Sequence, residues 1–193
     1  AMDHYDIVPD IMTLAKGIAS SYIPFGAVAV SAEINAPFES GETHFIHGFT
    51  NGGHPLGCAA GSELIDIIRD ENLLENCRKQ SEVLFSYREQ LLAHPTVRDV
   101  RGWGLMMVLE LIKDKESLDF FDSSLQAEKL YSAITLKHGL VMYGSLYGPR
   151  RQAAFKRGLP SWISPPLTIS GEEMHDLMGR LDNALSEWES IVL

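Results

Sequence analysis

The sequence predicts an α/β segment that leads through a long helical region into a smaller α+β domain. Three observations support this prediction. Short apolar runs of strand type occur in residues 1–35, helical periodicity dominates residues 57–93, and strand-like and helical patterns alternate from residue 96 onward. We therefore expect three parts, which comprise residues 1–70, 71–95 and 96–193.

The first part contains two expected strands and a loop. Residues 11–15 form a short apolar run that ends at Lys16-Gly17, and residues 26–31 have an AVAV core that is typical of a buried sheet. The polar, glycine-rich stretch 35–55 is expected to be a loop.

Two helical patterns follow this loop. Apolar residues recur at helical spacing over 57–69 and 73–93, and three polar residues separate the two patterns. Cys58 and Cys77 lie in these patterns without the spacing of metal ligands, so we expect two reduced, buried thiols and no metal site.

The third part alternates between strand and helix patterns. The expected elements are strands at 97–100 and 104–112, a helix at 124–137 ended by Gly139, a strand at 140–143, a polar insertion at 144–161, a strand near 162–169 and an amphipathic helix at 171–193. Pro165-Pro166 confines the strand near residue 162 to a sheet edge, because proline cannot donate a ladder hydrogen bond.

Composition excludes several classes of function. A net charge of −10 argues against a nucleic-acid partner, and no apolar run approaches the roughly 20 residues of a membrane-spanning helix. No signal-peptide pattern opens the chain, so we expect a cytoplasmic protein with no membrane partner. Because the chain has no initiator methionine and starts close to a dense motif, we expect it to be the C-terminal portion of a longer protein.

Lys16 is the sharpest candidate for a chemical role. An ammonium group at the end of an apolar strand costs free energy to bury unless it has a task. The residues alone leave two interpretations open. In the first, the aliphatic stem of the Lys16 side chain packs while its charged ammonium group reaches water. In the second, a desolvated Lys16 amine forms an imine with an aldehyde.

Two motifs resemble those of a known family. The segment PDIMTLAKGIASSYIPFGAVAVS, which contains Lys16, resembles the cofactor-lysine segment of class III pyridoxal-phosphate aminotransferases, the ω-amino acid:pyruvate group of fold type I. Residues 47–60, HGFTNGGHPLGCAA, resemble the family's HGFTYSGHPLGCAA, and Ser164-Pro165-Pro166-Leu167 is similar to its APPL stretch. The resemblance covers essentially the whole chain. It implies the end of a large cofactor-binding α/β domain in residues 1–70, a connecting helix in 71–95 and a small α+β domain in 96–193.

The resemblance also implies roles for individual residues. Lys16 forms the internal aldimine with pyridoxal 5′-phosphate and shuttles a proton at the substrate Cα. Thr50, with Phe49 beside it, bonds the cofactor phosphate from the neighbouring subunit of a homodimer, although the glycine-rich loop alone is equally compatible with a plain turn. Tyr22 and Trp162 are candidates to line the substrate pocket, with core packing open for Trp162. The implied reaction moves an amino group from an amine or ω-amino acid to an α-keto acid such as pyruvate.

The sequence departs from the family in three respects. In the second motif Asn51 and Gly52 replace the usual Tyr-Ser, which leaves Thr50 intact. Tyr143 stands where many members carry an arginine that binds the substrate carboxylate, and a tyrosine cannot pair with it bidentately. Arg150, Arg151 or Arg157 in the inserted loop is a candidate to supply that charge, and a solvated basic loop is the simpler interpretation. In family members the carboxylate that pairs with the pyridine nitrogen precedes this segment, so the missing N-terminal half is an expected partner.

Three other functions remain as alternatives. An aminomutase or racemase of the same family uses the same lysine. A catalytically incomplete fragment acts only as a folding or dimerisation partner. A pyridoxal-independent, lysine-dependent aldolase is more distant, and it needs no added cofactor.

Overall fold

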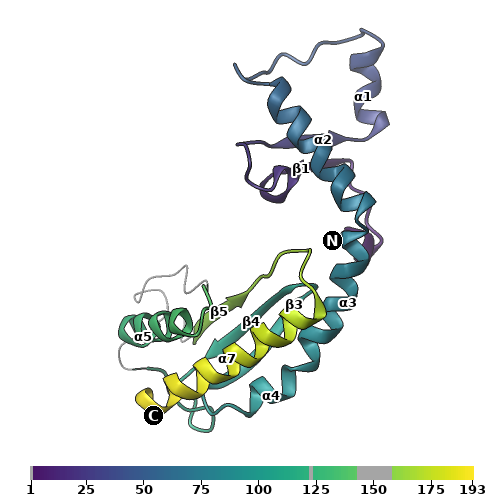
Figure 1. Ribbon diagram of the computed structural model, residues 1–193. Coiled ribbons are helices and arrows are strands. Elements are labelled where there is room, and N and C mark those ends of the chain that lie inside the picture. The colour runs from purple at the N-terminus through teal and green to yellow at the C-terminus, as the bar shows by residue number, and fades with distance from the viewer. Residues whose placement is uncertain (1, 122–123, 143–157) are drawn as a thin grey trace. The chain divides into compact units, whose positions relative to one another are not determined.

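A computed structural model describes residues 2–121, 124–142 and 158–193 (Figure 1). The chain divides into two compact units, residues 1–72 (unit 1) and residues 73–193 (unit 2). Among the described residues, every helix is too short or too polar to cross a membrane.

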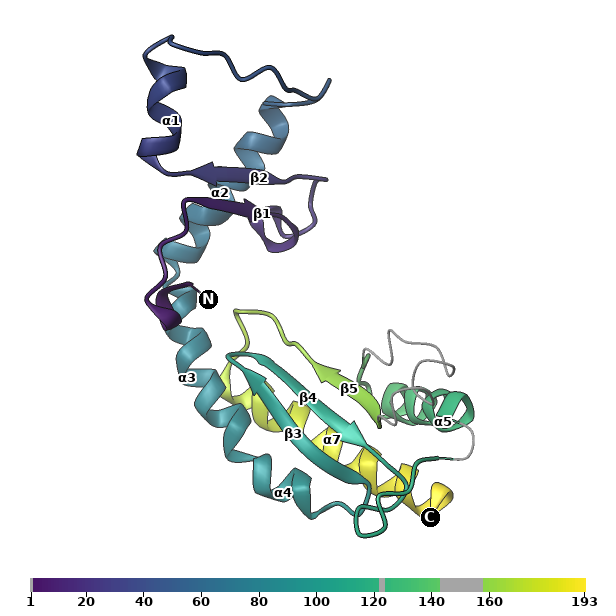
Figure 2. The same ribbon diagram turned by 180° about the vertical axis from the view of Figure 1, so that it is seen from behind.

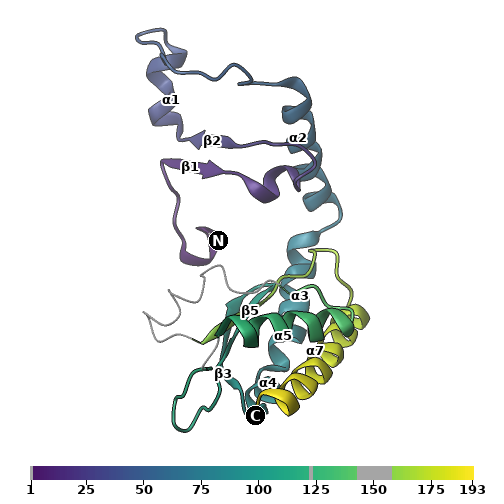
Figure 3. The same cartoon turned by 90° about the vertical axis from the view of Figure 1, so that its left-hand side faces the viewer.

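Unit 1 is built on a two-stranded antiparallel sheet. Its elements are η1 (Met2–Tyr5), β1 (Ile11–Leu14), η2 (Lys16–Ala19), β2 (Ala27–Val30), α1 (Ala32–Glu39) and α2 (Pro55–Asp70), where η denotes a 3₁₀ helix. The strands pair from Ile11 with Val30 to Leu14 with Ala27. Figure 3 shows that a loop carries the chain from the end of α1 to the start of α2.

Two expectations about unit 1 are wrong. The AVAV strand is not buried, and Val28 on it is 63% exposed, because no second layer among the described residues of this unit covers the two strands. The expected loop from residue 35 starts later, because α1 forms first. The Ser31 hydroxyl caps this helix by accepting a hydrogen bond from the Ile34 amide at 3.4 Å, which satisfies a backbone donor of the first turn.

Unit 2 contains an antiparallel sheet in the order β3-β4-β5 and its helices. Its elements are α3 (Leu73–Ser86), α4 (Arg88–Ala93), β3 (Val97–Trp103), β4 (Met106–Leu111), α5 (Ser124–Lys137), β5 (Leu159–Ile163) and α7 (Gly171–Val192). Helix α7 runs along one face of the sheet, and Figure 2 shows it behind the three strands.

The core of unit 2 lies between this sheet and its helices. Alternate residues of β4, Met107, Leu109 and Leu111, are fully buried, as expected for a strand with one face toward a core. Trp188 of α7 is fully buried with them, and its indole N–H donates to the Ala127 carbonyl at 3.2 Å. This cluster contains most of the buried apolar residues of the described chain.

The expected helix over residues 73–93 is split at Tyr87. The Ser86 hydroxyl donates to the Val83 carbonyl at 2.7 Å, and the Tyr87 amide donates to Leu84 three residues back. Both bonds compete with the regular i to i−4 pattern, so α3 ends and α4 starts anew.

The helix ended by Gly139 is confirmed, but the described part of the strand expected after it does not form. The Gly139 amide donates to Leu136 and the Leu140 amide donates to Thr135, a Schellman cap that uses the Leu140 donor. The strand near residue 162 is also shorter than expected. It ends at Ile163, before the two prolines that cannot continue a ladder.

The cysteines differ from the expectation in burial. Both thiols are free, as expected, but Cys58 is exposed and Cys77 is half-buried. Cys58 follows buried Gly57 on α2, so the helix turn points it away from the packed face.

Candidate functional site

Lys16 lies two residues after the end of β1, as the first residue of η2, in an unusual backbone conformation. It is exposed, and its φ of 57° is in the left-handed region, as are those of Ser20 at 46° and Ser21 at 63°. None of the three is a glycine. A non-glycine residue in this backbone conformation costs free energy, and it persists only where the surrounding structure enforces the conformation. Strain of this kind concentrates at functional sites, which makes the turn around Lys16 a candidate site.

An aromatic ring couples this turn to α2. Phe25 lies just before β2, and its ring occupies the space beside Gly57 and Gly61 on the buried face of α2. A Cβ at Gly61 would be 2.7 Å from the Phe25 ring, and one at Gly57 would be 3.0 Å from it. The two glycines, four residues apart, therefore form a seat for Phe25 on one face of the helix.

Thr50 lies in an exposed turn that precedes the same helix. The Gly52 amide donates to the Phe49 carbonyl at 2.9 Å, and the His54 amide donates to the Asn51 carbonyl at 3.2 Å. Helix α2 then starts at Pro55 and has no acidic residue in its first turn. An exposed hydroxyl close to a helix N-terminus without nearby carboxylates suits a phosphate group.

The loop before Thr50 carries a stack of rings. Phe38 of α1 contacts Phe45, Phe45 contacts His47, and His47 contacts Phe49, each edge to face. The ring centroids are 5.9, 5.8 and 5.0 Å apart in that order. We call these four residues the aromatic stack. It connects α1 to the residue next to Thr50.

The structure brings together only some of the predicted site residues. Lys16 and the 90% exposed Tyr22 share the turn after β1, and Phe49 and Thr50 share the loop before α2. Trp162 lies on β5 in unit 2, and its indole nitrogen is buried without a hydrogen-bond partner among the described residues. The four remaining candidates, Tyr143, Arg150, Arg151 and Arg157, lie outside the described residues.

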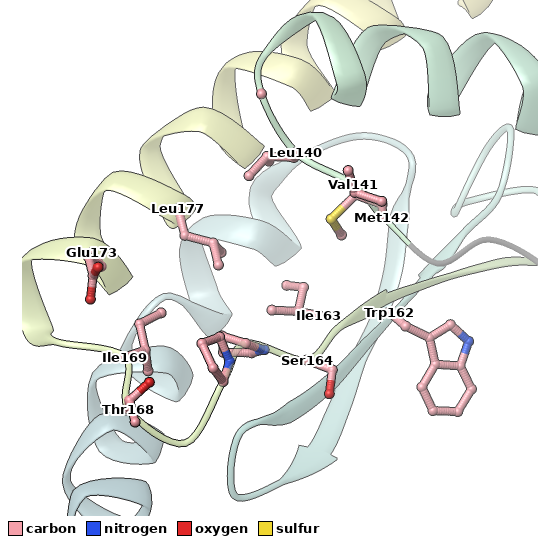
Figure 4. Close-up of a pocket in the computed structure, with 13 residues that line it drawn as sticks. Leu140, Val141, Met142, Trp162, Ile163, Ser164, Thr168, Ile169, Glu173 and Leu177 are labelled. Carbon is pink, nitrogen blue, oxygen red and sulfur yellow. The ribbon is translucent and has the colours of Figure 1, made fainter. Parts of the chain in front are cut away.

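A pocket of about 380 Å³ lies in unit 2 (Figure 4). The chain after α5, the end of β5 and the start of α7 form its wall, which includes Leu140, Met142, Ile163 and Glu173. Trp162 belongs to the wall, but its indole ring points away from the other side chains (Figure 4). None of the described residues that line this pocket is a lysine, so the described wall does not contain the predicted chemistry.

Sequence reasoning missed two features of the site. The first is the aromatic stack, for which the alternation of Phe45, His47 and Phe49 in an extended loop was an available signal. The second is the seat of Phe25, indicated by glycines four residues apart on a helix. Among the described residues, no three His, Cys, Asp or Glu side chains lie together as metal ligands would.

Comparison with known proteins gives a consistent result. The family described as aminotransferase class-III matches residues 1–185. The diaminobutyrate–2-oxoglutarate transaminase of Halomonas elongata is 34% identical over 188 residues, which are 95% of this chain and 38% of that protein. The chain therefore spans well under half the length of such a relative.

Solved structures show the same likeness. A thermostable (S)-enantioselective ω-transaminase from Thermomicrobium roseum is 35% identical with a TM-score of 0.81, over 97% of this chain and 39% of that one. Two structures of a Vibrio fluvialis aminotransferase, one PMP-bound and one a PLP-bound mutant, are each 28% identical with a TM-score of 0.82, over the whole of this chain and 40% of theirs. The fold is thus part of the class III aminotransferase fold, with mixed α and β elements. The chain belongs to the class III aminotransferase family.

Proposed function

We propose that this chain forms part of a pyridoxal-phosphate-dependent transaminase. The enzyme moves an amino group from an amine or ω-amino acid to an α-keto acid such as pyruvate. The observation that carries the proposal is the strained, exposed Lys16 just after β1, in a chain that matches the family over residues 1–185. The PMP-bound and PLP-bound relatives support the choice of cofactor.

The residues of the chain have separable tasks in this proposal. Lys16 would hold the cofactor and, as a free amine, would take a proton from the substrate Cα and deliver it to the cofactor carbon C4′, on the other side of the amine nitrogen. When bound, the cofactor would supply an electron-withdrawing ring that stabilises negative charge at the substrate Cα. Thr50 donates its hydroxyl to the cofactor phosphate across a homodimer interface, with Phe49 beside it. Tyr22 and Trp162 shape the substrate pocket.

Recognition of the acceptor's carboxylate is assigned to the inserted loop. Tyr143 offers only one hydroxyl to a carboxylate, whereas a guanidinium group offers two parallel donors. Arg150, Arg151 or Arg157 is the proposed partner.

The remaining length of the enzyme supplies the groups that hold the pyridine ring, and it covers the apolar surface that unit 1 exposes. In this assignment residues 1–70 belong to the large cofactor domain and residues 96–193 form the small domain. Residues 71–95 form the helix that connects the two domains.

Reductive trapping tests the proposal directly. The full-length protein is incubated with pyridoxal phosphate, reduced with borohydride and digested, and the labelled peptide is identified by mass spectrometry. We expect label on Lys16, loss of that label in Lys16→Ala, and full labelling in the control Lys79→Ala, which removes another exposed lysine. Label on a different lysine contradicts the assignment.

The same experiment separates the alternatives. A trapped cofactor in a protein that turns over its amine substrate without requiring any keto-acid acceptor supports an aminomutase or racemase. Trapping in the full-length protein but not in the 193-residue chain means that this chain alone is catalytically incomplete. An imine with substrate in the absence of pyridoxal phosphate supports the aldolase.

A further inference from the structure

We propose that the aromatic stack is a positioning device for Thr50, with His47 as its central member. The inference rests on the proposed function, because it assigns to Thr50 the contact with the cofactor phosphate. It adds Phe38, Phe45 and His47, which act on the cofactor through Thr50 without touching it.

The loop that carries Thr50 has few other contacts. Within the described residues, no backbone group of residues 44–48 forms a hydrogen bond with another backbone group. The loop is tied at its start by the Thr43 amide, which donates to the Pro37 carbonyl at 3.3 Å, and at its end by the turn after Phe49. The ring contacts are therefore the main interactions between these two ties.

The stack links a regular element to the residue beside Thr50. Phe38 is part of α1, and its ring meets Phe45 at an interplanar angle of 85°. His47 then meets Phe45 at 78° and Phe49 at 85°, so it touches both of its neighbours in the stack. Edge-to-face packing is a favoured arrangement of aromatic rings. Removal of the His47 ring alone would disconnect Phe49 and Thr50 from the rest of the stack.

Preordering of this loop has a consequence for binding. A loop that must be ordered when a ligand binds loses conformational entropy, and this loss weakens the affinity. A loop that is already held in place avoids the loss. The stack therefore acts on cofactor affinity and leaves the chemical step at Lys16 unchanged.

The test measures cofactor affinity in the full-length protein after removal of the cofactor. The dissociation constant for pyridoxal phosphate is determined by fluorescence titration for His47→Ala and for His47→Phe, which keeps a ring. His44→Ala is the matched control, because His44 is an exposed histidine of the same loop outside the stack. Each variant is also made in a Thr50→Ala background.

We expect His47→Ala to raise the dissociation constant about tenfold, comparable to the loss of one hydrogen bond to a charged group. His47→Phe restores it to within about twofold and His44→Ala leaves it unchanged, because only the ring contacts matter. In the Thr50→Ala background His47→Ala has no further effect, because the stack acts through Thr50. At saturating cofactor, kcat of His47→Ala equals that of the unsubstituted protein.

Unchanged affinity for pyridoxal phosphate in His47→Ala overturns the proposal. So does a loss of affinity that is as large when His47→Ala is added to Thr50→Ala as when it is made alone. Should circular dichroism show that His47→Ala does not fold, Phe45→Leu takes its place under the same criteria. A full-length protein that binds no pyridoxal phosphate overturns the proposed function itself. Failure of the stack alone is distinct, because cofactor then binds and Thr50→Ala weakens it while His47→Ala does not.

Discussion

His94 is held at both ring nitrogens by carboxylates of α7. Its Nδ1 lies 2.8 Å from Glu189 Oε2 and its Nε2 lies 3.0 Å from Asp182 Oδ1. Glu189 is itself buried, and its second oxygen accepts hydrogen bonds from the Thr96 hydroxyl at 2.6 Å and the Thr96 amide at 3.1 Å. Gln90 of α4 donates to Asp182 at 2.9 Å. This cluster ties the segment before β3 to the last turns of α7.

The two main groups of the cluster have shifted pKa values. The hydrogen bond to Glu189 raises the pKa of His94 above its ordinary value of 6.5, against the opposing effect of burial. Burial alone would raise the pKa of Glu189, but the hydrogen bonds from His94 and Thr96 outweigh it and lower the pKa below 4.5. Each group therefore favours the charged form of the other in the folded state.

We predict that these shifts give unit 2 a pH window of maximal stability. The contribution of His94 to the free energy of unfolding is fully present below its pKa in the unfolded chain. It is lost as pH rises through its higher pKa in the folded chain. The contribution of Glu189 is present above its unfolded pKa and is lost as pH falls through its lower folded pKa. The free energy of unfolding is thus expected to be highest between about pH 4.5 and 6.5, near the two ordinary values. Urea titrations at several pH values, followed by tryptophan fluorescence, measure it in unit 2, which contains all three tryptophans.

Substitutions separate the acidic and the alkaline side of this dependence of stability on pH. His94→Gln is expected to flatten the decline in stability above pH 6.5. Glu189→Gln is expected to lower the free energy of unfolding at pH 6 by about 1.5–3 kcal/mol, the scale of hydrogen bonds to a charged group. A profile for His94→Gln that keeps the alkaline decline would show that another group causes it.

Helix α2 acts at the scale of an element, because it holds the turn after β1 and starts just after the turn of Thr50. The contact with the turn after β1 depends on small residues of the helix. Gly61 is buried under the ring of Phe25, which follows the turn of Lys16. The ring packs directly on the helix there, because Gly61 has no side chain and the site has no room for one.

We predict that Gly61→Ala destabilises the protein, although alanine is the better helix former. The added Cβ lies 2.7 Å from the Phe25 ring and forces a shift, at a cost of about 1–3 kcal/mol that exceeds the gain in helix propensity. Gly179→Ala on α7 is the matched control, since its Cβ meets nothing within 4 Å, and it is expected to be neutral or stabilising. Thermal melting of the full-length variants measures both effects. Phe25→Leu is expected to relieve part of the cost in the double variant, and a Gly61→Ala protein as stable as the control would contradict the seat of Phe25.

The elements differ in how well the sequence predicts them. The amphipathic helix over residues 171–193 and the helix ended by Gly139 are confirmed nearly to the residue, because periodicity and capping are local signals. Helix α1 was missed because its eight residues contain Pro37 and lack a strong apolar face. The split at Tyr87 coincides with two local hydrogen bonds, from the Ser86 hydroxyl and the Tyr87 amide, which no periodicity reveals.

The candidate site was predictable only in part. Lys16 and Thr50 came from motifs that resemble the family, while the left-handed backbone at Lys16 depends on packing that the sequence does not display. The aromatic stack could be suspected from alternation, but alternation does not say which rings touch. The carboxylate-binding candidates Tyr143, Arg150, Arg151 and Arg157 remain predictions.

At the scale of the whole molecule, the two units differ in how much core they contain. Among the described residues of unit 1, Ala19 is the only buried apolar side chain apart from glycine. Unit 2 contains a continuous cluster that includes Leu84, Leu109 and Trp188, all fully buried. Burial of apolar surface is the dominant favourable contribution to folding, so the stability of the isolated chain is concentrated in unit 2.

We predict that hydrogen exchange of the isolated 193-residue chain separates the two units. A two-stranded sheet without a covering layer is marginally stable in water, so the amides of β1 and β2 are expected to exchange at least about 100-fold faster than those of β4. The full-length protein is the control. There we expect β1 and β2 to gain protection, because further chain covers surface that unit 1 exposes, such as Val28. Exchange in β1 as slow as in β4 in the isolated chain would show that unit 1 is stable by itself, and would contradict the prediction that unit 1 depends on further chain to cover its exposed apolar surface.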